Sequence, residues 1–312
     1  KRMRFLYIFL FSIFFSLNNS SFQIKEMANE KFVIDFKLED YEIINEDGYV
    51  KLLVPGSGTK SLIGEPFLPS LSSFVELDKN ASYTISYEII SKNEIENQKI
   101  IPLQNFDRNI KENDYVKNES IYSSQSLFPE KNLYVSERQA MRGTEFVNLE
   151  VIPFSYNAID NHLVVIEEIE ITIEKNTTPN IPISRNYPRS KVFERLTDSF
   201  LVNSSSNLRT DDYQRPSILY ICGGNTSSNP FFNQLKKWRE KQGYIVYVAS
   251  TSEIGGSGTT VIKNYLVESM SWETPPEFVT LIGDDGGSYD IDSYTEYNSG
   301  YNGEGHHPYS QL

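Results

Sequence analysis

The chain has 312 residues, and at about 150 residues per domain this length predicts two domains. Hydrophobic residues make up 39% of the chain, which is enough for packed cores and excludes wholesale disorder. The formal charge of −13 argues against nucleic acid or an anionic membrane as a partner. The single cysteine excludes an internal disulfide, and three histidines leave little for a histidine-rich metal site.

The first segment has the layout of a secretory signal peptide. Lys1, Arg2 and Arg4 precede an apolar run over residues 5–17, and the polar residues 18–21 follow it. A membrane span needs roughly 18 or more apolar residues, so this run is short for one. We therefore expect residues 1–21 to direct export to the cell surface or the extracellular space, with membrane contact only during export.

Residues 22–178 are predicted to form a β-rich domain. Apolar and polar residues alternate with a period of two in four segments, residues 32–38, 83–89, 147–151 and 169–173. This pattern puts one face of each strand on a core and the other in water, as in an antiparallel sandwich. Nothing in this half carries chemistry, so a β-sandwich that binds a partner is a complete interpretation of it.

The pattern breaks over residues 179–215, which we interpret as a linker. A short helix is predicted around residues 192–201, and residues 203–212 are rich in serine, asparagine and aspartate. Polar connectors of this kind are favoured sites of proteolytic cleavage. Arg209 and Arg215 are expected to be exposed there, and ordinary linker arginines are the alternative interpretation.

From residue 216 to residue 312 the pattern predicts the start of an α/β domain. Continuous apolar runs at residues 217–222, 244–249 and 278–282 are typical of parallel strands that are buried on both faces. Helical patterns between these runs give the order βαβαβ, with the helices on the faces of the sheet.

Two helices are expected between these strands. The first begins after Asn229, a capping residue, and carries Phe231, Leu235 and Trp238 at i, i+4 and i+7, the spacing of a helix face that packs on a core. The second begins at residues 259–260, where either threonine can serve as the cap.

Active sites in such sheets lie beyond the carboxyl ends of the strands, which here are residues 223–226 and 283–287. Residues 284–312 contain no lysine or arginine and six acidic residues, Asp284, Asp285, Asp290, Asp292, Glu296 and Glu304. Oxygen-rich loops can hold calcium, and Asp284 and Asp285 are the candidate ligands of a structural calcium ion. The spacing matches no EF-hand, and a solvated acidic loop is the alternative.

Familiar catalytic signatures are absent from the sequence. The glycine-rich residues 255–258 form neither a nucleophile elbow nor a phosphate loop. Cys222 lies inside an apolar strand, where a thiol is usually inert packing. His306 and His307, as neighbours on one strand, would point to opposite faces and share no metal. No cofactor is expected to be required.

In combination these segments resemble the gingipain-type cysteine peptidase family. The stretches that match the opening of its peptidase domain are Ser217–Cys222, Phe232–Gly243, Phe278–Asp284 and Tyr309–Leu312. The stretches similar to its propeptide are Gly64–Pro69, Arg142–Gly143, Val147–Tyr156 and Leu163–Ile173. The order and spacing of these stretches carry the resemblance over nearly the whole chain after the signal.

The resemblance implies a secreted zymogen, in which a β-sandwich prodomain contacts a caspase-like α/β peptidase domain within one chain. In that family a histidine draws the proton from a cysteine, and the thiolate attacks the carbonyl of a protein or peptide substrate. Both residues belong to later strands, so no catalytic residue is expected before Leu312 and this piece alone should be inactive. Arg209 and Arg215 become candidate maturation sites, Arg215 the weaker because proline follows it.

Two other functions stay open at this point. The complete protein could be a sortase-like accessory that processes surface proteins on the same fold. It could also be a non-enzymatic, exported β-sandwich binding module with a degenerate α/β appendage. A later strand ending in His-Gly, followed by one ending in Ala-Cys, would favour an enzyme over the binding module.

Overall fold

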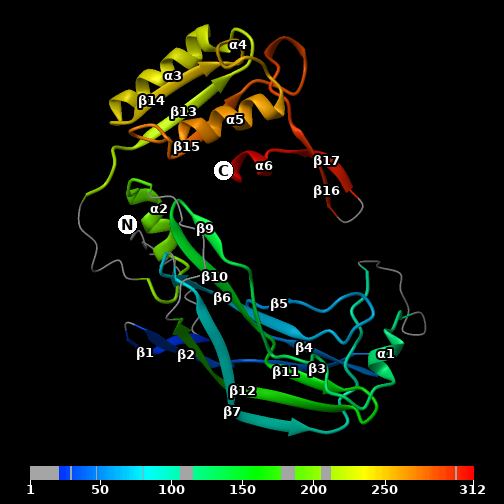
Figure 1. The fold of residues 1–312 in the computed structure, drawn as a ribbon. Coiled ribbons are helices and arrows are strands. Elements are labelled where there is room, and N and C mark those ends of the chain that lie inside the picture. Colours follow the sequence, from blue (N-terminus) through cyan, green and yellow to red (C-terminus); the bar gives the residue numbers. More distant parts are fainter. Residues whose placement is uncertain are drawn as a thin grey trace, which may run out of the picture. The chain divides into compact units, whose positions relative to one another are not determined.

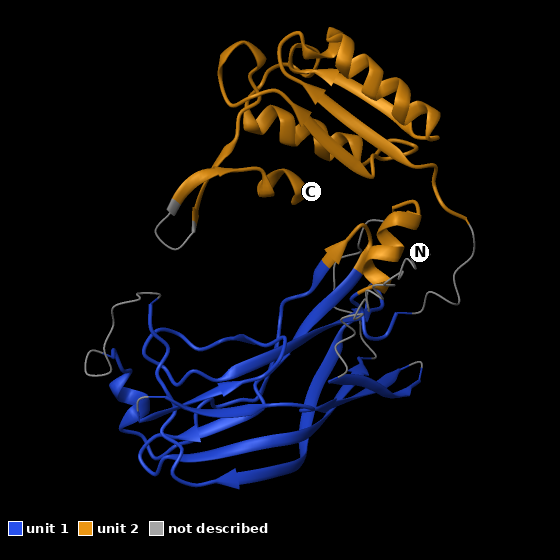
Figure 2. Ribbon diagram, turned by 180° about the vertical axis from the view of Figure 1, so that it is seen from behind, with its two compact units in different colours: residues 1–139, 145–183, 200–204 blue, residues 140–144, 184–199, 205–312 orange. Residues whose placement is uncertain are grey.

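The computed structural model describes residues 21–28, 30–46, 48–79, 81–105, 115–176, 187–204, 212–298 and 301–312. The chain divides into two compact units (Figure 2). Unit 1 comprises residues 1–139, 145–183 and 200–204, and unit 2 comprises residues 140–144, 184–199 and 205–312. The predicted signal peptide lies outside the described residues except for Ser21, and among the described residues no helix has the length and apolar character of a membrane span.

The first half of the chain forms two five-stranded antiparallel sheets (Figure 1). The first sheet has the order β1-β2-β12-β11, with β7 also paired to β12, and its strands are β1 (Phe22–Met27), β2 (Lys31–Lys37), β7 (Tyr83–Ile95), β11 (Phe154–Asn157) and β12 (His162–Lys175). The second has the order β5-β6-β10-β8, with β9 also paired to β10, and its strands are β5 (Gly58–Thr59), β6 (Pro69–Leu77), β8 (Leu133–Val135), β9 (Gln139–Met141) and β10 (Thr144–Val151). A two-stranded ribbon, β3 (Glu42–Glu46) with β4 (Tyr49–Leu53), and a short helix, α1 (Glu119–Tyr122), complete this half.

The core of unit 1 contains apolar side chains from both sheets. Phe36 of β2, Leu149 of β10 and Ile171 of β12 are all completely buried and belong to one cluster. The four segments with alternating apolar residues are the strands β2, β7, β10 and β12, as their pattern predicts. The predicted antiparallel sandwich is therefore confirmed.

Unit 2 contains a parallel sheet of three strands in the order β14-β13-β15. The strands are β13 (Ser217–Cys222), β14 (Ile245–Ser250) and β15 (Phe278–Ile282), and an antiparallel hairpin follows, β16 (Tyr294–Asn298) with β17 (Tyr301–Gly305). The helices are α2 (Lys191–Asp198), α3 (Pro230–Lys241), α4 (Thr251–Ile254), α5 (Thr259–Ser269) and α6 (His307–Ser310), with 3-10 turns at Thr226–Ser228 and Gly287–Tyr289. The predicted start of an α/β domain with a parallel sheet is confirmed.

The helices α3 and α5 lie on opposite faces of the central strand β13. Leu219 and Ile221 share a cluster with Ile262 and Leu266 of α5. The alternate residues of β13, among them Tyr220, share a second cluster with Phe232 of α3. Successive side chains of a strand point to opposite faces, so one strand serves both clusters.

The prediction that all three strands are buried on both faces is wrong for β14 and β15. All residues of β13 are buried, whereas Phe278 and Val279 of β15 are 37% and 40% exposed. Within the described residues β14 and β15 each pair with β13 alone, so they are the edges of this sheet. An apolar run therefore predicts the strand but not the cover on its faces.

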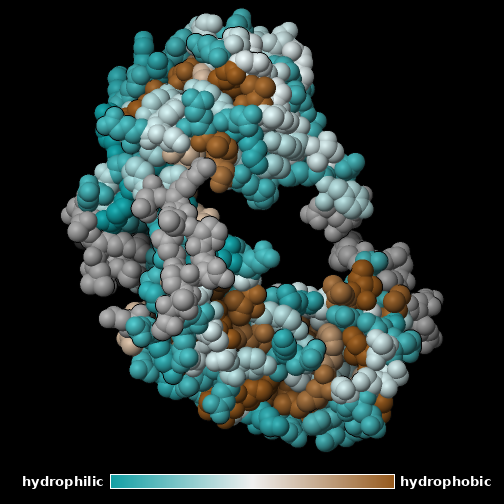
Figure 3. Space-filling view, viewed as in Figure 1, coloured by the Kyte–Doolittle hydropathy of each residue, from teal (hydrophilic) through white to brown (hydrophobic). Residues whose placement is uncertain are grey.

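The face of α3 predicted to pack on the core is also wrong, although the helix itself is confirmed. The side chain of Asn229 accepts a hydrogen bond from the N–H of Phe231 and caps the helix as expected. Phe231 and Trp238 are nevertheless 77% and 51% exposed, because Phe232 enters the core instead and packs edge-on against Tyr220. Exposed hydrophobic residues lie among hydrophilic ones on the surfaces of both units (Figure 3).

The ends of the other predicted helices need small changes. Gly258, without a side-chain hydrogen bond, caps α5 one residue before the expected threonine. The linker helix is confirmed as α2, whose cap Ser190 accepts a hydrogen bond from the N–H of Phe193. The predicted linker at residues 179–215 contributes segments to both compact units.

Candidate functional site

Glycines at the carboxyl ends of β13 and β15 let a loop lie directly on the strand ends. A Cβ atom at Gly223 would stand 2.1 Å from the carbonyl oxygen of Tyr289, and one at Gly283 would stand 2.2 Å from the same atom. The N–H of Asp284 donates to this carbonyl at 3.1 Å. Only glycine leaves room for this backbone approach, so the two glycines fix where the following acidic loop lies.

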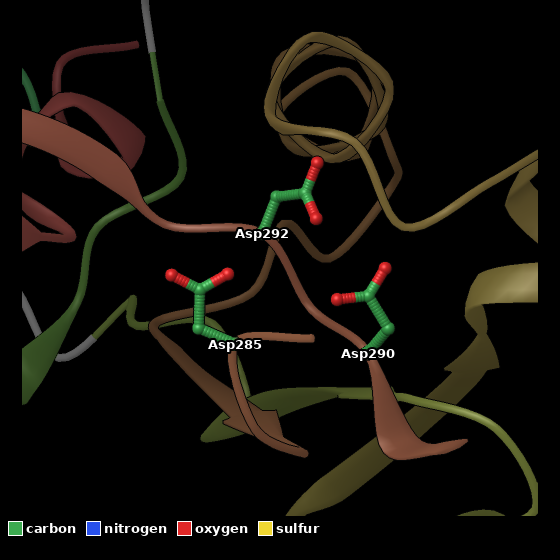
Figure 4. A group of neighbouring side chains, drawn as sticks. All are labelled: Asp285, Asp290 and Asp292. Atoms are coloured by element: carbon green, nitrogen blue, oxygen red, sulfur yellow. The ribbon is translucent and has the colours of Figure 1, made fainter. Parts of the chain in front are cut away.

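The loop brings three carboxylates together. One oxygen each from Asp285, Asp290 and Asp292 lie within 4.8 Å of one another, and Figure 4 shows the three side chains gathered there. Asp290 accepts hydrogen bonds from the N–H of Gly286 at 2.7 Å and from the hydroxyl of Ser257. These two hydrogen bonds fix the position of the Asp290 carboxylate within the group of three.

The electrostatics of this group are those of like charges held close. Burial, followed by the charges of Asp290 and Asp285, raises the pKa of Asp292. The hydroxyl of Ser257 and the N–H of Gly286 lower the pKa of Asp290. Three oxygen ligands from one loop suit a hard cation such as calcium, whose charge would relieve the repulsion.

Sequence reasoning found only part of this group. Asp285 belongs to it, while Asp284 does not and instead accepts a hydrogen bond from the N–H of Asp285 at 3.0 Å. Asp290 and Asp292 also belong to it, although the sequence offers them only as two of six acidic residues. No local signal in the sequence identifies them, because the three carboxylates meet only through the 3-10 turn at Gly287–Tyr289.

The side chains of Cys222, His306 and His307 form no catalytic group. Burial raises the pKa of the Cys222 thiol, which has no exposed surface, whereas a nucleophilic cysteine needs a lowered pKa. Nε2 of His306 lies 3.0 Å from the hydroxyl of Ser293, and Nε2 of His307 lies 2.9 Å from the side-chain nitrogen of Gln311. The expectation that the histidines share a strand is wrong, because His307 is the first residue of α6.

A second polar site in unit 2 is built around Arg142. This arginine and Gly143 form the two-residue turn between β9 and β10, with φ angles of 46° and 82°. Two positive φ values are typical of a type I′ hairpin turn, in which arginine is an unusual residue. Its guanidinium donates to the carbonyls of Pro276 at 2.9 Å and Pro275 at 3.2 Å.

The two candidate maturation sites differ in their surroundings. Arg209 lies outside the described residues. Arg215 is exposed, and its Nε donates to the carbonyl of Gly243 at 3.1 Å. The carbonyl of the next residue, Pro216, accepts a hydrogen bond from Ile245 at 2.8 Å, so the bond after Arg215 is held at the start of the sheet.

Comparison with known proteins assigns both halves of the chain. The family model Propeptide_C25 matches residues 30–203, and the model of peptidase family C25 matches residues 211–301. Lys-gingipain of Porphyromonas gingivalis is 20% identical over 257 residues, which cover 76% of this chain and 14% of the relative. Lys-gingipain W83 from the same organism matches to the same extent. The chain thus spans 14% of the length of these curated relatives.

Two solved structures are similar to parts of the chain. The complex of the Porphyromonas gingivalis RgpB pro- and mature domains covers 59% of this chain and 97% of its own, with 16% identity and a TM-score of 0.48. A structure of gingipain K from the same organism, titled for its zymogenic latency, covers 50% and 93%, with 16% identity and a TM-score of 0.42. Because the propeptide model alone matches more than half of the chain and the peptidase model follows it, this chain belongs to peptidase family C25, the gingipain family, and comprises its propeptide and the start of its peptidase domain.

Proposed function

We propose that the complete protein is a secreted cysteine endopeptidase, made as a zymogen that residues 22 to 209 inhibit until the linker is cut. The observation that carries this proposal is the order of the two family matches. The propeptide match ends at residue 203 and the peptidase match begins at residue 211, so Arg209 falls between them.

The chemistry would be that of a His/Cys dyad beyond Leu312. The histidine would take the thiol proton, the thiolate would attack the peptide carbonyl, and backbone amides would hold the oxyanion. The burial of Cys222 supports a nucleophile elsewhere in the protein. Substrates would be proteins or peptides, and the strands β13 and β15 would form the beginning of the sheet that positions the dyad.

Arg209 is the preferred maturation site over Arg215. Most peptidases cut poorly before proline, and the carbonyl of Pro216 is already bound to β14. A bond held by a sheet must be released before it can enter a peptidase cleft as an extended segment. The polar, serine- and asparagine-rich composition around Arg209 supports cleavage there instead.

The carboxylates of Asp285, Asp290 and Asp292 are proposed to hold a structural calcium ion. The convergence of three oxygen ligands and the raised pKa of Asp292 support this proposal. The ion would tie the acidic loop to the loop at Ser257, whose hydroxyl already donates to Asp290. No catalytic step is assigned to it.

The deciding experiment extends the reading frame past Leu312 and expresses the complete protein. We expect downstream strands ending in histidine and cysteine, and a mature amino terminus just after Arg209. Replacing the downstream cysteine by alanine should leave the zymogen uncut. Arg209→Ala should block maturation, while Arg215→Ala, its matched control in the same linker, should not.

The two other functions predict different outcomes. A sortase-like accessory would join a cleaved carbonyl to an added amine, whereas an endopeptidase would release it to water. A binding module would lack the downstream histidine and cysteine, and its linker would persist in purified protein. Absence of both residues from the complete reading frame contradicts the peptidase.

A further inference from the structure

Unit 2 is assembled from chain on both sides of the proposed cut at Arg209. Residues 140–144 and 184–199 precede the cut, and residues 212–312 follow it, yet all belong to one compact unit. We propose that Arg142 is the anchor that keeps the amino-terminal part bound to the α/β part after the linker is cleaved. This inference rests on the proposed function only in taking the linker as the place of cleavage.

The guanidinium of Arg142 is bound by three acceptors that all lie after the cut. Its Nη1 donates to the carbonyl of Pro276 at 2.9 Å. Its Nη2 donates to the side-chain oxygen of Gln214 at 2.8 Å and to the carbonyl of Pro275 at 3.2 Å. Hydrogen bonds from a charged donor are about twice as strong as those between neutral groups. The arginine therefore holds two separate segments of the α/β part at once.

The surroundings of Arg142 combine burial with one negative charge, that of Glu277. Burial lowers the pKa of its guanidinium, and the negative charge of Glu277 acts in the opposite direction. Glu277 is only 7% exposed, and its Oε2 has no hydrogen-bond partner among the described residues. Without the arginine, this buried carboxylate would lose the cation that compensates it.

The surface that Arg142 contacts is also hydrogen-bonded within itself. The carbonyl of Pro275 also accepts hydrogen bonds from the side-chain nitrogen of Gln214 at 3.1 Å and from the hydroxyl of Ser217 at 2.8 Å. The ring of Pro275 fixes its φ angle, and the proline that follows restricts its ψ angle, so the carbonyl of Pro275 has few orientations. Acceptors that are already held by other hydrogen bonds lose little conformational entropy when they bind the guanidinium.

The helix α2 adds contacts that also bridge the cut. The ring of Phe193 lies 5.5 Å from the guanidinium carbon of Arg142 and 6.2 Å from the ring of Phe278. The N–H of Gln214 donates to the carbonyl of Arg189 at 2.8 Å. Arg142 is thus held between an aromatic face that precedes the cut and acceptors that follow it.

The acceptors of Arg142 lie at the amino-terminal ends of the parallel strands, opposite to the loops at their carboxyl-terminal ends. Pro275 and Pro276 precede β15, separated from it by Glu277, whereas Gly223 and Gly283 follow β13 and β15. In a parallel sheet these are opposite ends of the strands, and ligands bind beyond the carboxyl-terminal ends. Arg142 can therefore retain the cut segment without any contact at the end of the sheet where ligands bind.

The test cleaves the linker of the full 312-residue chain without its own catalysis. Residues 205–211 are replaced by the recognition sequence of a site-specific protease, and a carboxyl-terminal tag immobilises the α/β part. After cleavage, the wild-type amino-terminal part should stay bound. In Arg142→Asn, which keeps a residue that tolerates positive φ, its release should be about thirtyfold faster, as expected for loss of a charged hydrogen-bond donor.

Three control measurements distinguish loss of the Arg142 contact from misfolding and from a general effect of removing a positive charge. Arg195→Ala removes an exposed arginine of α2 and should leave the release rate unchanged. Gln214→Ala weakens the same contact from the other side and should speed release in the same direction as Arg142→Asn. Uncut Arg142→Asn should keep the far-UV circular dichroism spectrum of the wild type, which shows that the variant still folds.

Two results overturn the anchor. One is immediate loss of the wild-type segment on cleavage, and the other is a release rate that neither Arg142→Asn nor Gln214→Ala changes. Failure of the complete protein to cut its own linker would contradict the proposed function, but it would not alter this binding measurement. The two failures are therefore distinguishable.

Discussion

Ile171 of the sandwich strand β12 and Val279 of the parallel strand β15 are both β-branched apolar residues, yet they differ in burial. β12 pairs with β2 and β11 on one side and with β7 on the other, and its Ile171 has no exposed surface. β15 pairs only with β13 among the described residues, and Val279 is 40% exposed. Two apolar side chains of similar size are thus buried to different extents because their strands have different places in their sheets.

The largest expected effect tests this difference directly. Ile171→Ala should lower the free energy of unfolding of the sandwich by about 4 kcal/mol, because it leaves a cavity in a closed core. The matched truncation Val279→Ala should cost less than about 1 kcal/mol, because the side chain is already partly in water. Urea denaturation followed by far-UV circular dichroism measures both, and equal losses would contradict the comparison.

Two adjacent residues sharpen the same comparison within one helix. Phe232→Ala should destabilise unit 2 by about 3 kcal/mol, since its ring packs against Tyr220 at a centroid distance of 5.2 Å. Phe231→Ala should change stability by less than about 0.5 kcal/mol, since that ring is 77% exposed. Thermal unfolding of the two variants decides between this geometry and the helix face predicted from spacing.

A third prediction concerns the close backbone approach at the end of β13. Gly223→Ala should destabilise unit 2 by about 2 kcal/mol, because the added methyl group would overlap the carbonyl of Tyr289. Gly58→Ala is the matched control, since its added Cβ would have only Ser70 at 3.9 Å. Wild-type stability in Gly223→Ala would mean that the acidic loop does not rest on the strand end.

The smallest effect is expected from the acidic group. The folded state binds the proton of Asp292 more tightly than the unfolded state does, because its pKa is raised. Protonated Asp292 therefore stabilises the fold at a pH below the ordinary carboxyl pKa. This stabilisation is lost as the pH rises through the raised pKa of Asp292. Asp292→Asn should remove this loss and raise the unfolding temperature of the metal-free protein at pH 7 by about 1 °C.

Calcium provides the accompanying test of the same group. Added calcium should raise the unfolding temperature of the wild type and of Asp284→Asn, whose carboxylate lies outside the group. It should have no effect on Asp292→Asn or Asp290→Asn. A response in these two variants, or none in the wild type, would count against a calcium site formed by these carboxylates.

Local patterns were sufficient to predict most of the longest strands and helices of this fold, but not its short strands, the hairpin of β16 and β17 or the short helices. The strands β13 and β15 begin and end where their apolar runs do, and the cap at Asn229 correctly gives the start of α3. These features depend on a few neighbouring residues, so one sequence contains enough information. The antiparallel sandwich followed from the period-two alternation for the same reason.

Tertiary relations could not be predicted in this way. The choice between Phe231 and Phe232 depends on how α3 is rotated against Tyr220, which is distant in sequence. The contact of Arg142 with Pro275 and Pro276 joins residues more than a hundred positions apart. The grouping of Asp285 with Asp290 and Asp292 needs the turn at Gly287–Tyr289, which no spacing rule supplied.

The pairing of β2 with β12 has a consequence for how the chain is made. Residues 32–36 emerge early in synthesis, but their partners at 169–173 follow only after almost the whole sandwich. Until then β1 and β2 form an isolated pair, which is marginally stable at best in water. Such a chain folds slowly because its contacts are distant in sequence. This delay leaves the free edge of β2 without its partner until the last strand of the sandwich has been made.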